Sequence, residues 1–300
     1  MTRRGWVLFL AMSVIWGVPY LMIRVAVEEI SPGTLVFLRT GLAALLLVPI
    51  ALARGEVRAA LVRWRWLVVF TAIEIAIPWV LLASAETHVS SSLAALIIAG
   101  VPLVGAAITR ASGERLGRSN LAGLFVGLAG VGAIVGTEIG GGDARAFAEL
   151  GAVAVCYAVG PIILSRYLAE VPALAVVALS LGIAALAYAP VAAFNLPDGM
   201  LSGRVIASVL GLAFLCTALA FLLFFALIAE IGPVRATVIT YVNPAVAAIA
   251  GVTILDEAFT AGMGVGFVLV LVGSFFATRP GTKRQPVPAR LEPAVAETKT

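Results

Sequence analysis

The sequence predicts an all-α polytopic membrane protein in which ten transmembrane helices form two inverted five-helix repeats. Three observations lead to this fold class. The composition is strongly apolar, ten apolar runs have the length of a membrane crossing, and several unusual residues recur at a fixed offset along the chain. The first two observations establish the class, and the third divides the helices into two halves.

The composition is that of a membrane protein. Of the 300 residues, 62% are hydrophobic and 12% are charged, which is about half the charged share of an ordinary soluble domain. So few charges do not cover the surface of a soluble fold of this length. This composition excludes an intrinsically disordered chain, a disulfide scaffold and a nucleic-acid-binding protein that works through a basic surface.

The apolar runs have the length that a bilayer requires. A transmembrane helix needs about 20 apolar residues to cross ~30 Å of hydrocarbon, and ten such runs lie between charged and turn residues. The run at Leu121–Gly136 is short and rich in glycine, which makes it the weakest candidate for a full span. The ten runs are Trp6–Val27, Gly33–Ala53, Trp66–Ser84, Ser91–Thr109, Leu121–Gly136, Leu150–Ser165, Leu174–Phe194, Ile206–Ala229, Ala236–Ile254 and Ala261–Thr278.

The two ends of the chain differ in character. Arg3 and Arg4 precede the first run as they would precede a signal peptide, but no small-residue cleavage site follows. We therefore expect an uncleaved first helix. Residues 280–300 mix proline, threonine and charges, and are predicted to form a disordered cytoplasmic tail.

The positive charges predict the orientation of the helices. If the N-terminus lies in the cytoplasm, sixteen of the twenty Lys and Arg residues fall in cytoplasmic loops or termini. Arg145 and Arg204 fall in outside loops, and Arg24 and Arg39 fall within spans. This asymmetry follows the positive-inside rule, so both termini of a plasma-membrane protein are expected to be cytoplasmic. The net charge of +4 arises from the same bias and carries no indication of nucleic-acid binding.

The two halves of the chain match at an offset of 142 residues, which becomes 143 near the end of each half. Because each half holds five helices, an odd number, the second half would lie upside down relative to the first. Inverted repeats of this kind are typical of secondary transporters. We place the first repeat at residues 1–141 and the second at residues 146–279. The matched pairs are Pro19 with Pro161, Arg24 with Arg166, Glu28 with Glu170, Ala94 with Ala236, Pro102 with Pro244, Glu114 with Glu257, Gly123 with Gly266 and Gly130 with Gly273.

Several motifs carry a resemblance to a known family. They are Trp16-Gly17-Val18-Pro19, Phe37-Leu38-Arg39, Ala94-Ala95-Leu96-Ile97 with Val101-Pro102 and Gly113-Glu114-Arg115-Leu116, and a weaker second-half copy in Asn243-Pro244 with Asp256-Glu257-Ala258-Phe259. With these motifs the chain resembles the ten-helix EamA family of the drug/metabolite transporter (DMT) superfamily over about residues 5 to 279. The resemblance implies export or exchange of small metabolites, commonly amino acids or drugs, driven by a gradient rather than by ATP.

The halves depart from one another in two places. The spacing from Pro102 to Glu114 is 12 residues, whereas that from Pro244 to Glu257 is 13. Arg39 has no basic counterpart in the second half, where Leu181 stands. The symmetry is therefore approximate, and Arg39 is specific to the first half.

Glu74 is the foremost candidate for a functional residue. Trp64 and Trp66 mark the inner end of its span, and eight residues of helix beyond Trp66 place Glu74 roughly 12 Å deep. A carboxylate at that depth costs about 2.5 kcal/mol or more unless it faces a cavity or a partner. Glu74 is therefore either a site for a substrate amine or a coupling proton, or one half of a structural ion pair with Arg39.

Arg39 is the second candidate, roughly 10 Å from the outer face of its span. Its guanidinium would either capture a substrate carboxylate or hold the span in register. If Arg39 and Glu74 both face a cavity, their opposite charges would suit a zwitterion such as an amino acid. We therefore expect amino acids, or related amines and drugs, as the substrate class.

Two prolines are predicted hinges. Pro102 and Pro244 lie within the fourth and ninth spans, where a proline removes a backbone donor and kinks the helix. The carbonyls that are freed can line a cavity. The family resemblance puts the substrate path beside these helices, where Tyr241 and Asn243 add polar side chains to the candidate site.

Interior aromatic residues complete the candidate site. Trp16, Tyr20, Trp79 and Tyr157 lie inside spans rather than at their ends. Such residues commonly pack against other helices. In an exporter of organic solutes they would also contact the substrate, and a cation–π contact would suit an amine. We include Trp16, Tyr20 and Trp79 among the substrate-binding residues.

Other notable residues have expected structural roles. Glycines of the fifth span predict close helix packing, and charged residues at the span ends predict ion pairs or caps. The glycines are Gly123, Gly127 and Gly130; the predicted pairs are Arg24 with Glu28 and Arg166 with Glu170; the predicted turn or cap residues are Glu114, Asp256 and Glu257.

Neither a cofactor nor a metal site is expected. Cys156 and Cys216 fall inside predicted spans, and the sole histidine, His88, falls in a short outer loop. No zinc-protease, nucleophile-elbow or P-loop motif occurs, which disfavours the alternative of an intramembrane enzyme. A non-transporting scaffold, the other alternative, would need neither an inverted repeat nor buried charges. A channel would need a filter sequence, and none is apparent.

We therefore expect a secondary active transporter, an exporter of small organic metabolites that works by alternating access. The sequence leaves the coupling ion open, a proton included. It also leaves the oligomeric state open, a homodimer included.

Overall fold

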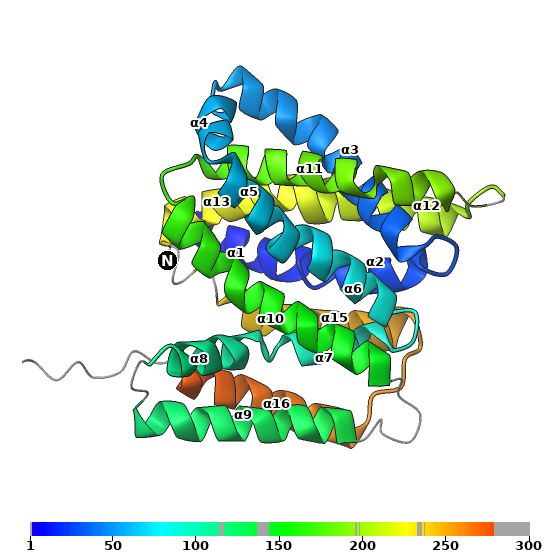
Figure 1. Ribbon diagram of the computed structural model, residues 1–300. Coiled ribbons are helices and arrows are strands. Elements are labelled where there is room, and N and C mark those ends of the chain that lie inside the picture. The colour runs from blue at the N-terminus through cyan, green and yellow to red at the C-terminus, as the bar shows by residue number, and fades with distance from the viewer. Residues whose placement is uncertain are drawn as a thin grey trace, which may run out of the picture.

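The computed structural model describes residues 2–113, 117–136, 144–195, 197, 199–232, 236 and 238–278. Within these residues the chain is helical and contains no strand, as expected of a polytopic all-α membrane protein (Figure 1). The predicted tail at 280–300 lies outside the described residues, as does Glu114.

Ten helical segments, several of them built from two or three consecutive helices, correspond to the ten apolar runs. The first half has five of these segments: α1 (Arg3–Ile15) with α2 (Pro19–Ala26); α3 (Pro32–Ala53); α5 (Trp64–Thr71) with η1 (Ala72–Ala76) and α6 (Ile77–Ala85); α7 (Ser91–Ile98) with α8 (Val101–Ala111); and α9 (Arg118–Gly136). A short helix, α4 (Val57–Val62), lies in the connection between α3 and α5. In the second half they are α10 (Ala144–Tyr167); α11 (Ala173–Phe194); α12 (Gly203–Leu210), η2 (Gly211–Leu219) and α13 (Ala220–Ile231); α15 (Ile239–Ile254); and α16 (Ala261–Ala277). Eight of the segments are long and apolar enough to cross a membrane, whereas α15 and α16 are shorter apolar helices.

Hydroxyl side chains fix where several helices begin. The side chains of Ser31, Ser90 and Ser202 each accept a hydrogen bond from a backbone N–H in the first turn of α3, α7 and α12, respectively. Thr2 and Thr260 do the same for α1 and α16. Since the first N–H groups of a helix have no partner within it, these caps stabilise the helix starts at the edge of the apolar bundle.

The two predicted hinges differ in the structure. Pro102 lies in the first turn of α8, directly after a break at Ala99 and Gly100 that separates it from α7. Pro244 lies inside α15, which continues through it as one helix. A proline removes the hydrogen bond four residues back, and only the first half turns that loss into a break.

Repeat-equivalent helices form the main contacts between the halves. The most extensive contacts join α9 to α16 and α3 to α11. Figure 1 shows these pairs at opposite edges of the molecule, with the other helices between them. This arrangement is a two-repeat architecture in which each edge of the bundle is built by both halves.

The α9–α16 pair approaches through glycines, as the sequence predicts. A Cβ atom at Gly123 would lie 2.5 Å from the backbone nitrogen of Ala277, and one at Gly130 would lie 2.7 Å from the carbonyl oxygen of Gly266. Asn120 adds a hydrogen bond of 2.9 Å from its side-chain nitrogen to the carbonyl oxygen of Ala277. Small residues at such seams let membrane helices meet backbone to backbone.

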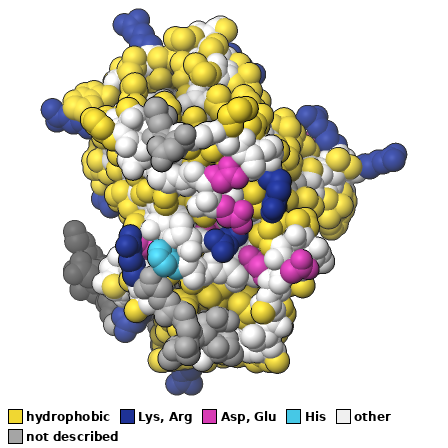
Figure 2. Space-filling model, turned by 90° about the vertical axis from the view of Figure 1, so that its right-hand side faces the viewer, with side chains coloured by type: hydrophobic (Ala, Val, Ile, Leu, Met, Phe, Trp, Pro, Cys, Tyr) yellow, Lys and Arg dark blue, Asp and Glu magenta, His cyan; other side chains and the backbone are white. Residues whose placement is uncertain are grey.

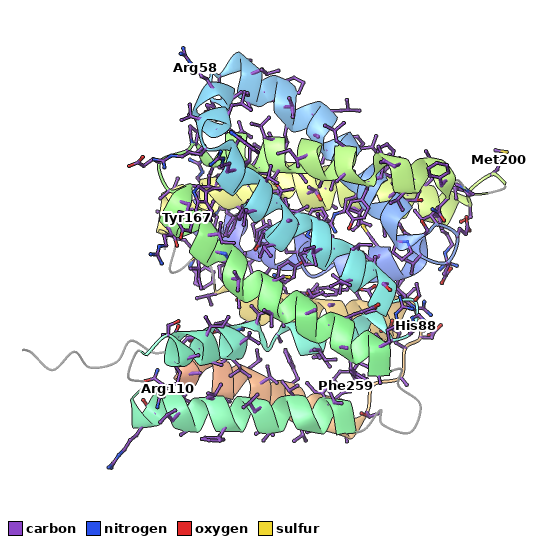
Figure 3. The ribbon with its side chains drawn as sticks, viewed as in Figure 1. Arg58, His88, Arg110, Tyr167, Met200 and Phe259 are labelled. Carbon is purple, nitrogen blue, oxygen red and sulfur yellow. The ribbon has the colours of Figure 1, made fainter. Side chains whose placement is uncertain are left out.

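The ends of the bundle are marked by the side chains labelled in Figure 3: Arg58, Arg110 and Tyr167 lie at one end, and His88, Met200 and Phe259 at the other. We call these the Arg58 end and the His88 end. Figure 2 views the molecule from the His88 end, where acidic side chains gather in the middle of a largely hydrophobic rim. Large apolar side chains such as Leu45, Phe125 and Leu186 are exposed on the flanks, as expected of a surface that faces lipid.

Candidate functional site

Arg39 is buried in the centre of the molecule and connects the two halves. The side chain projects from α3 with 8% of its surface exposed. Its Nε donates a hydrogen bond of 2.9 Å to the Thr217 hydroxyl in η2, and its guanidinium carbon lies 3.7 Å from the ring centroid of Trp79. The Thr217 hydroxyl donates in turn to the Leu212 carbonyl over 2.7 Å. Arg39 is therefore held by one hydrogen bond and one aromatic face, so that its guanidinium plane is fixed.

The positive charge of Arg39 has no carboxylate partner within 4.0 Å among the residues that the structure describes. The titratable groups close enough to act on it electrostatically are Cys216, Tyr157, Glu86 and Tyr20. Its two terminal nitrogens make no hydrogen bond within the described part of the chain. A guanidinium in this state retains donors for an anionic group such as a carboxylate.

Glu74 occupies the π-helical segment η1 and faces α10. Its Oε2 is buried and has no hydrogen-bond partner. The carboxylate packs directly against Gly160, where a Cβ atom would overlap it. Tyr157 and Cys156, on the same stretch of α10, lie close enough to interact with it electrostatically.

Arg39 and Glu74 do not form the ion pair that the sequence left as one alternative. No contact within 4.0 Å joins them, because Arg39 is turned toward Thr217 and Trp79 while Glu74 is turned toward Gly160. Tyr157 lies near both groups. The two groups are therefore not paired with one another, and the Tyr157 hydroxyl is within electrostatic reach of both.

The predicted aromatic residues divide into two groups. Trp79 and Tyr20 lie beside Arg39, the first beneath its guanidinium and the second within electrostatic reach. Trp16 packs elsewhere, with ring centroids 5.8 Å from Phe221 and 4.7 Å from Phe224 of α13. Trp16 therefore belongs to a packing cluster between α1 and α13.

Tyr241 and Asn243 are not brought to Arg39. The Tyr241 hydroxyl lies 3.4 Å from that of Thr278, at the end of α16. The Asn243 amide, oriented to satisfy its neighbours, donates to the carbonyls of Ile239 and Ser13 over 2.9 and 3.1 Å. Asn243 thus ties α15 to α1, and its half-buried amide finds hydrogen-bond partners within the apolar bundle.

Three residues of the centre were not selected from the sequence. Thr217 binds Arg39, Tyr157 is within electrostatic reach of both Arg39 and Glu74, and Glu86 is a third buried ionisable group near Arg39. Tyr157 was noted only as an interior aromatic. The repeat offset of 142 could have indicated Thr217, since it falls next to Cys216, the counterpart of Glu74.

Both predicted i,i+4 ion pairs at the helix ends are wrong. Arg24 donates from Nη1 to the backbone carbonyl of Glu86 over 2.9 Å instead of pairing with Glu28. Glu170 lies 3.5 Å from Arg63 instead of pairing with Arg166. Sequence spacing identifies neighbours on one helix, but here Arg24 and Glu170 bind groups from distant segments of the chain instead.

Glu257 is the helix cap that the sequence predicts. Its Oε1 accepts from the backbone N–H of Ser91 over 2.8 Å. Its Oε2 accepts from the backbone N–H of Ser92 over 2.9 Å and from the Ser92 hydroxyl over 2.5 Å. A carboxylate at a helix N-terminus is favoured by the orphan N–H groups and the helix dipole. Through this cap the turn after α15 is tied to the start of α7.

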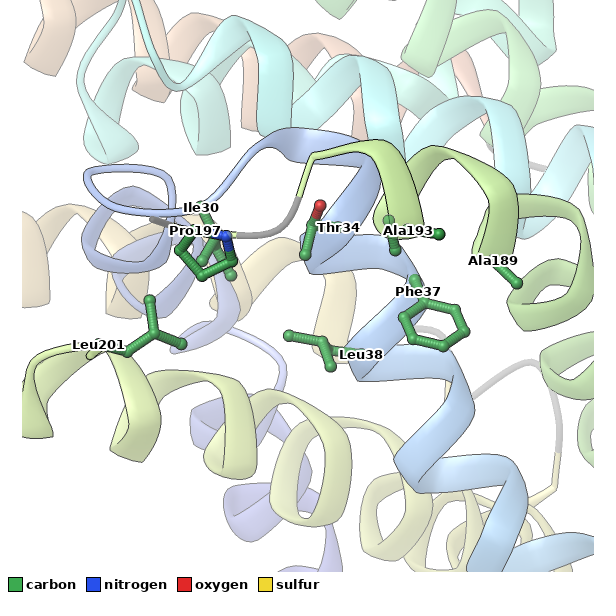
Figure 4. Close-up of a pocket in the computed structure, with 9 residues that line it drawn as sticks. Ile30, Thr34, Phe37, Leu38, Ala189, Ala193, Pro197 and Leu201 are labelled. Atoms are coloured by element: carbon green, nitrogen blue, oxygen red, sulfur yellow. The ribbon is translucent and has the colours of Figure 1, made fainter. Parts of the chain in front are cut away.

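Two apolar cavities lie away from these groups. One, of about 350 Å³, lies between the His88 ends of α3 and α11 and is lined by Phe37, Leu38 and Leu201, among others (Figure 4). The other, of about 540 Å³, continues from Phe37 and Leu38 along the same two helices toward the exposed Leu45 and Leu186. Their linings are almost wholly apolar, so they offer room for hydrocarbon rather than for a charged solute.

The fold and its centre define a polytopic helical membrane protein with two repeats and unpaired buried charges. The EamA-like transporter family model matches the chain twice, over residues 3–136 and 150–279. The chain belongs to the EamA-like transporter family and is a transporter of the DMT type. No curated protein matches the sequence. A solved structure described as "Crystal structure of protein" is similar in fold, with a TM-score of 0.65 and 23% identity over 93% of this chain and 97% of the other.

Proposed function

We propose that this protein is a secondary active transporter that exports amino acids or related amines and drugs by alternating access. One observation carries the proposal: Arg39 and Glu74 place opposite, unpaired charges in the apolar centre of the bundle. Ionisable residues within a membrane are costly and commonly serve transport. We infer transport rather than catalysis because the family is one of transporters.

The geometry supports a zwitterionic substrate. The terminal nitrogens of Arg39 make no hydrogen bond within the described part of the chain, and would bind a substrate carboxylate in a two-pronged hydrogen bond. The ammonium group of the same molecule would meet Glu74 and the faces of Tyr20 and Tyr157. Trp79 holds the guanidinium from below and would exclude water from that side.

The orientation and division of the chain form part of the proposal. We infer a plasma-membrane location with cytoplasmic termini, so that the Arg58 end faces the cytoplasm and the His88 end faces outward. Residues 1–141 and 146–279 are the two inverted repeats, and Pro102 and Pro244 are the hinges. The break before Pro102 supports the first hinge more directly than the continuous α15 supports the second.

Proteoliposomes test the proposal. The purified protein is reconstituted and assayed with radiolabelled leucine, lysine, glutamate and tyramine under imposed proton and sodium gradients. We expect uptake of at least one amino acid or amine, lost in Arg39→Leu and reduced in Glu74→Gln, while the exposed Glu28→Gln behaves as wild type. Wild-type transport in both site variants would refute the site, and failure to move any solute under any gradient would favour a scaffold.

A further inference from the structure

Glu86 is the most completely buried carboxylate of the described chain. It follows α6 directly, one residue beyond the membrane-crossing segment Trp64–Ala85, at the His88 end. None of its surface is exposed, and neither carboxylate oxygen has a hydrogen-bond partner. Arg24 donates to the backbone carbonyl of Glu86 and leaves the carboxylate without a donor. An ionised carboxylate without hydrogen-bond donors is strongly disfavoured in such a place.

The charged surroundings of Glu86 do not compensate for its burial. Arg24 and Tyr20 of α2 and Arg39 of α3 act on it electrostatically, and so does Glu257 from the turn after α15. Glu257 carries the same charge and is committed to the start of α7, whose first residues are serines without a titratable group.

The neighbouring helix α10 brings a second carboxylate to the same side. Glu149 of α10 accepts from Arg145 over 2.9 Å and from Ser84 over 3.0 Å, so one of its oxygens is satisfied there. Arg145 therefore forms an ion pair with Glu149 and none within 4.0 Å with Glu86.

The protonation of Glu86 follows from this balance. Burial raises the pKa of the Glu86 carboxyl well above its ordinary value, and Glu257 raises it further, while Arg24 and Arg39 lower it. Glu29, at the same end of the bundle, is the opposite case. It is exposed, and hydrogen bonds from Ser202 lower its pKa. Burial therefore favours the protonated form of the Glu86 carboxyl, whereas the surroundings of Glu29 favour its ionised form.

We propose that Glu86 is a proton-binding site of this transporter, protonated while the His88 ends of α2, α6 and α7 are packed as in this structure and ionised when that end opens to water. On opening, the O–H bond of the Glu86 carboxylic acid breaks, the proton passes to water at the His88 end, and the carboxylate becomes hydrated. The assignment deepens the proposed function and rests on it, because the proton is useful only to a protein that alternates between a closed and an open His88 end.

The packing around Glu86 makes the coupling mutual. Glu86 itself has no exposed surface, and neither have Ala26 at the end of α2, Ala85 at the end of α6, or Ser91 and Ser92, which bind Glu257 at the start of α7. Water therefore reaches Glu86 only if these helix ends move. Because the ionised form is stable only in the open state, raising the pH favours opening and lowering the pH favours closure. Below the raised pKa, the open population would rise about tenfold for each pH unit.

The experiment uses a cysteine as a reporter of opening and requires no substrate. Ser91→Cys is introduced together with Cys156→Ala and Cys216→Ala in the full chain reconstituted in nanodiscs, and its reaction with N-ethylmaleimide is timed from about pH 5 to 9. Ser91 is suited to this because it is buried in this structure and its backbone N–H binds Glu257, a group that acts electrostatically on Glu86. The same measurement with Glu86→Gln provides the reference, since glutamine copies the protonated acid. The ratio of the two rates cancels the ionisation of the cysteine itself.

We expect this ratio to rise about tenfold per pH unit until Glu86 is fully ionised, and Glu86→Gln to stay slow throughout. Glu149→Gln is the matched control, a carboxylate at the same end that also has one unpartnered oxygen, and should leave the ratio unchanged. A ratio that is constant with pH, or one that Glu149→Gln alters equally, overturns the assignment. If Glu86→Gln fails to fold, Glu86→Asp replaces it as the reference, and an unshifted pH profile of labelling then overturns the assignment. Because no solute is added, failure of the proposed substrate class leaves this result intact.

Discussion

The π-helical segments η1 and η2 occupy equivalent places in the two repeats but differ in the side chains that they carry. Adding the offset of 142 residues to Ala72–Ala76 gives Phe214–Ala218, which lies inside η2. At the shared position the first repeat carries Glu74 and the second carries Cys216. One carboxylate oxygen of Glu74 has no hydrogen-bond partner. In the second repeat the hydroxyl of Thr217, the residue after Cys216, both accepts a hydrogen bond from Arg39 and donates one to the Leu212 carbonyl.

Each segment is also held by the second helix of the opposite repeat. Arg39 of α3 bonds to Thr217 in η2, and the Tyr188 hydroxyl of α11 donates to the Ala76 carbonyl in η1 over 2.9 Å. The widened turns of π-helices leave backbone groups exposed and recur at functional sites. The difference shows how two repeats diverge: the crossed hydrogen bonds are kept, while one segment carries a carboxyl group and the other a hydroxyl that anchors Arg39.

The largest effect is expected from removing the anchored charge. Arg39→Leu should lower amino-acid transport roughly 30-fold or more, because lost hydrogen bonds to a buried charged partner cost about 2–5 kcal/mol. Arg39→Lys should fall between, since an ammonium lacks the two-pronged geometry of a guanidinium. Initial uptake rates in proteoliposomes, corrected for the amount of protein inserted, provide the measurement. Equal rates in Arg39→Leu and wild type would contradict a substrate role.

Glu74→Gln should separate substrates by charge. Solutes that carry an amine should lose about tenfold or more in transport, the value of a charge-assisted hydrogen bond of ~1.5–3 kcal/mol. Carboxylic acids without an amine should be unaffected, because they would use only Arg39. Parallel uptake of leucine and its deaminated analogue makes the comparison. A uniform loss for both would indicate a structural role for Glu74.

Gly160→Ala tests how closely η1 is packed. The new Cβ atom would displace the Glu74 carboxylate, and we expect a loss of about 1–3 kcal/mol in stability, as is usual for overpacking. Combining it with Glu74→Ala should remove most of that cost, because the obstructing group is gone. Thermal unfolding of the four proteins in detergent completes the cycle, and additive losses would exclude the contact.

The smallest effects are expected from the crossed hydrogen bonds. Thr217→Val and Tyr188→Phe should each lower stability by about 0.5–1.5 kcal/mol. Only Thr217→Val should also weaken transport, because it frees Arg39 to leave the face of Trp79. Unfolding and uptake measured on the same preparations would distinguish an anchor from a merely structural bond. Equal transport in both variants would argue that Arg39 needs no orienting partner.

Much of the fold follows from the sequence because burial in lipid leaves few alternatives. Apolar length predicts the ten segments, and small residues predict close packing of α9, but not that α16 is its partner. Position predicts a turn or cap role for Glu257, but not that α7 is the helix it caps. Arg39 and Glu74 stood out because charges are rare inside apolar runs. These predictions depend on composition and local spacing, which can be read from the sequence without knowledge of the fold.

The remaining features depend on contacts between distant segments. Glu86 escaped notice because a glutamate directly after a helix is usually solvated, and only the packing of α2 and α7 buries it. The π-helical turns escaped because one extra residue per turn barely alters an apolar pattern. The failed pair of Arg24 and Glu28 has the same origin, since the carbonyl that Arg24 binds belongs to another span.

The cap on α7 also has a consequence for the synthesis of the protein. Ser91 binds a carboxylate that lies 166 residues later in the chain, and a ribosome adding 5–20 residues per second needs roughly 10–30 s to supply it. In the first part of that interval α3 lacks its partner α11, and α9 lacks α16 until after Glu257 has been made. The nascent first half must therefore wait in the insertion machinery or among lipids with its seams open, which makes this interval the period in which quality-control proteases would recognise the chain most readily.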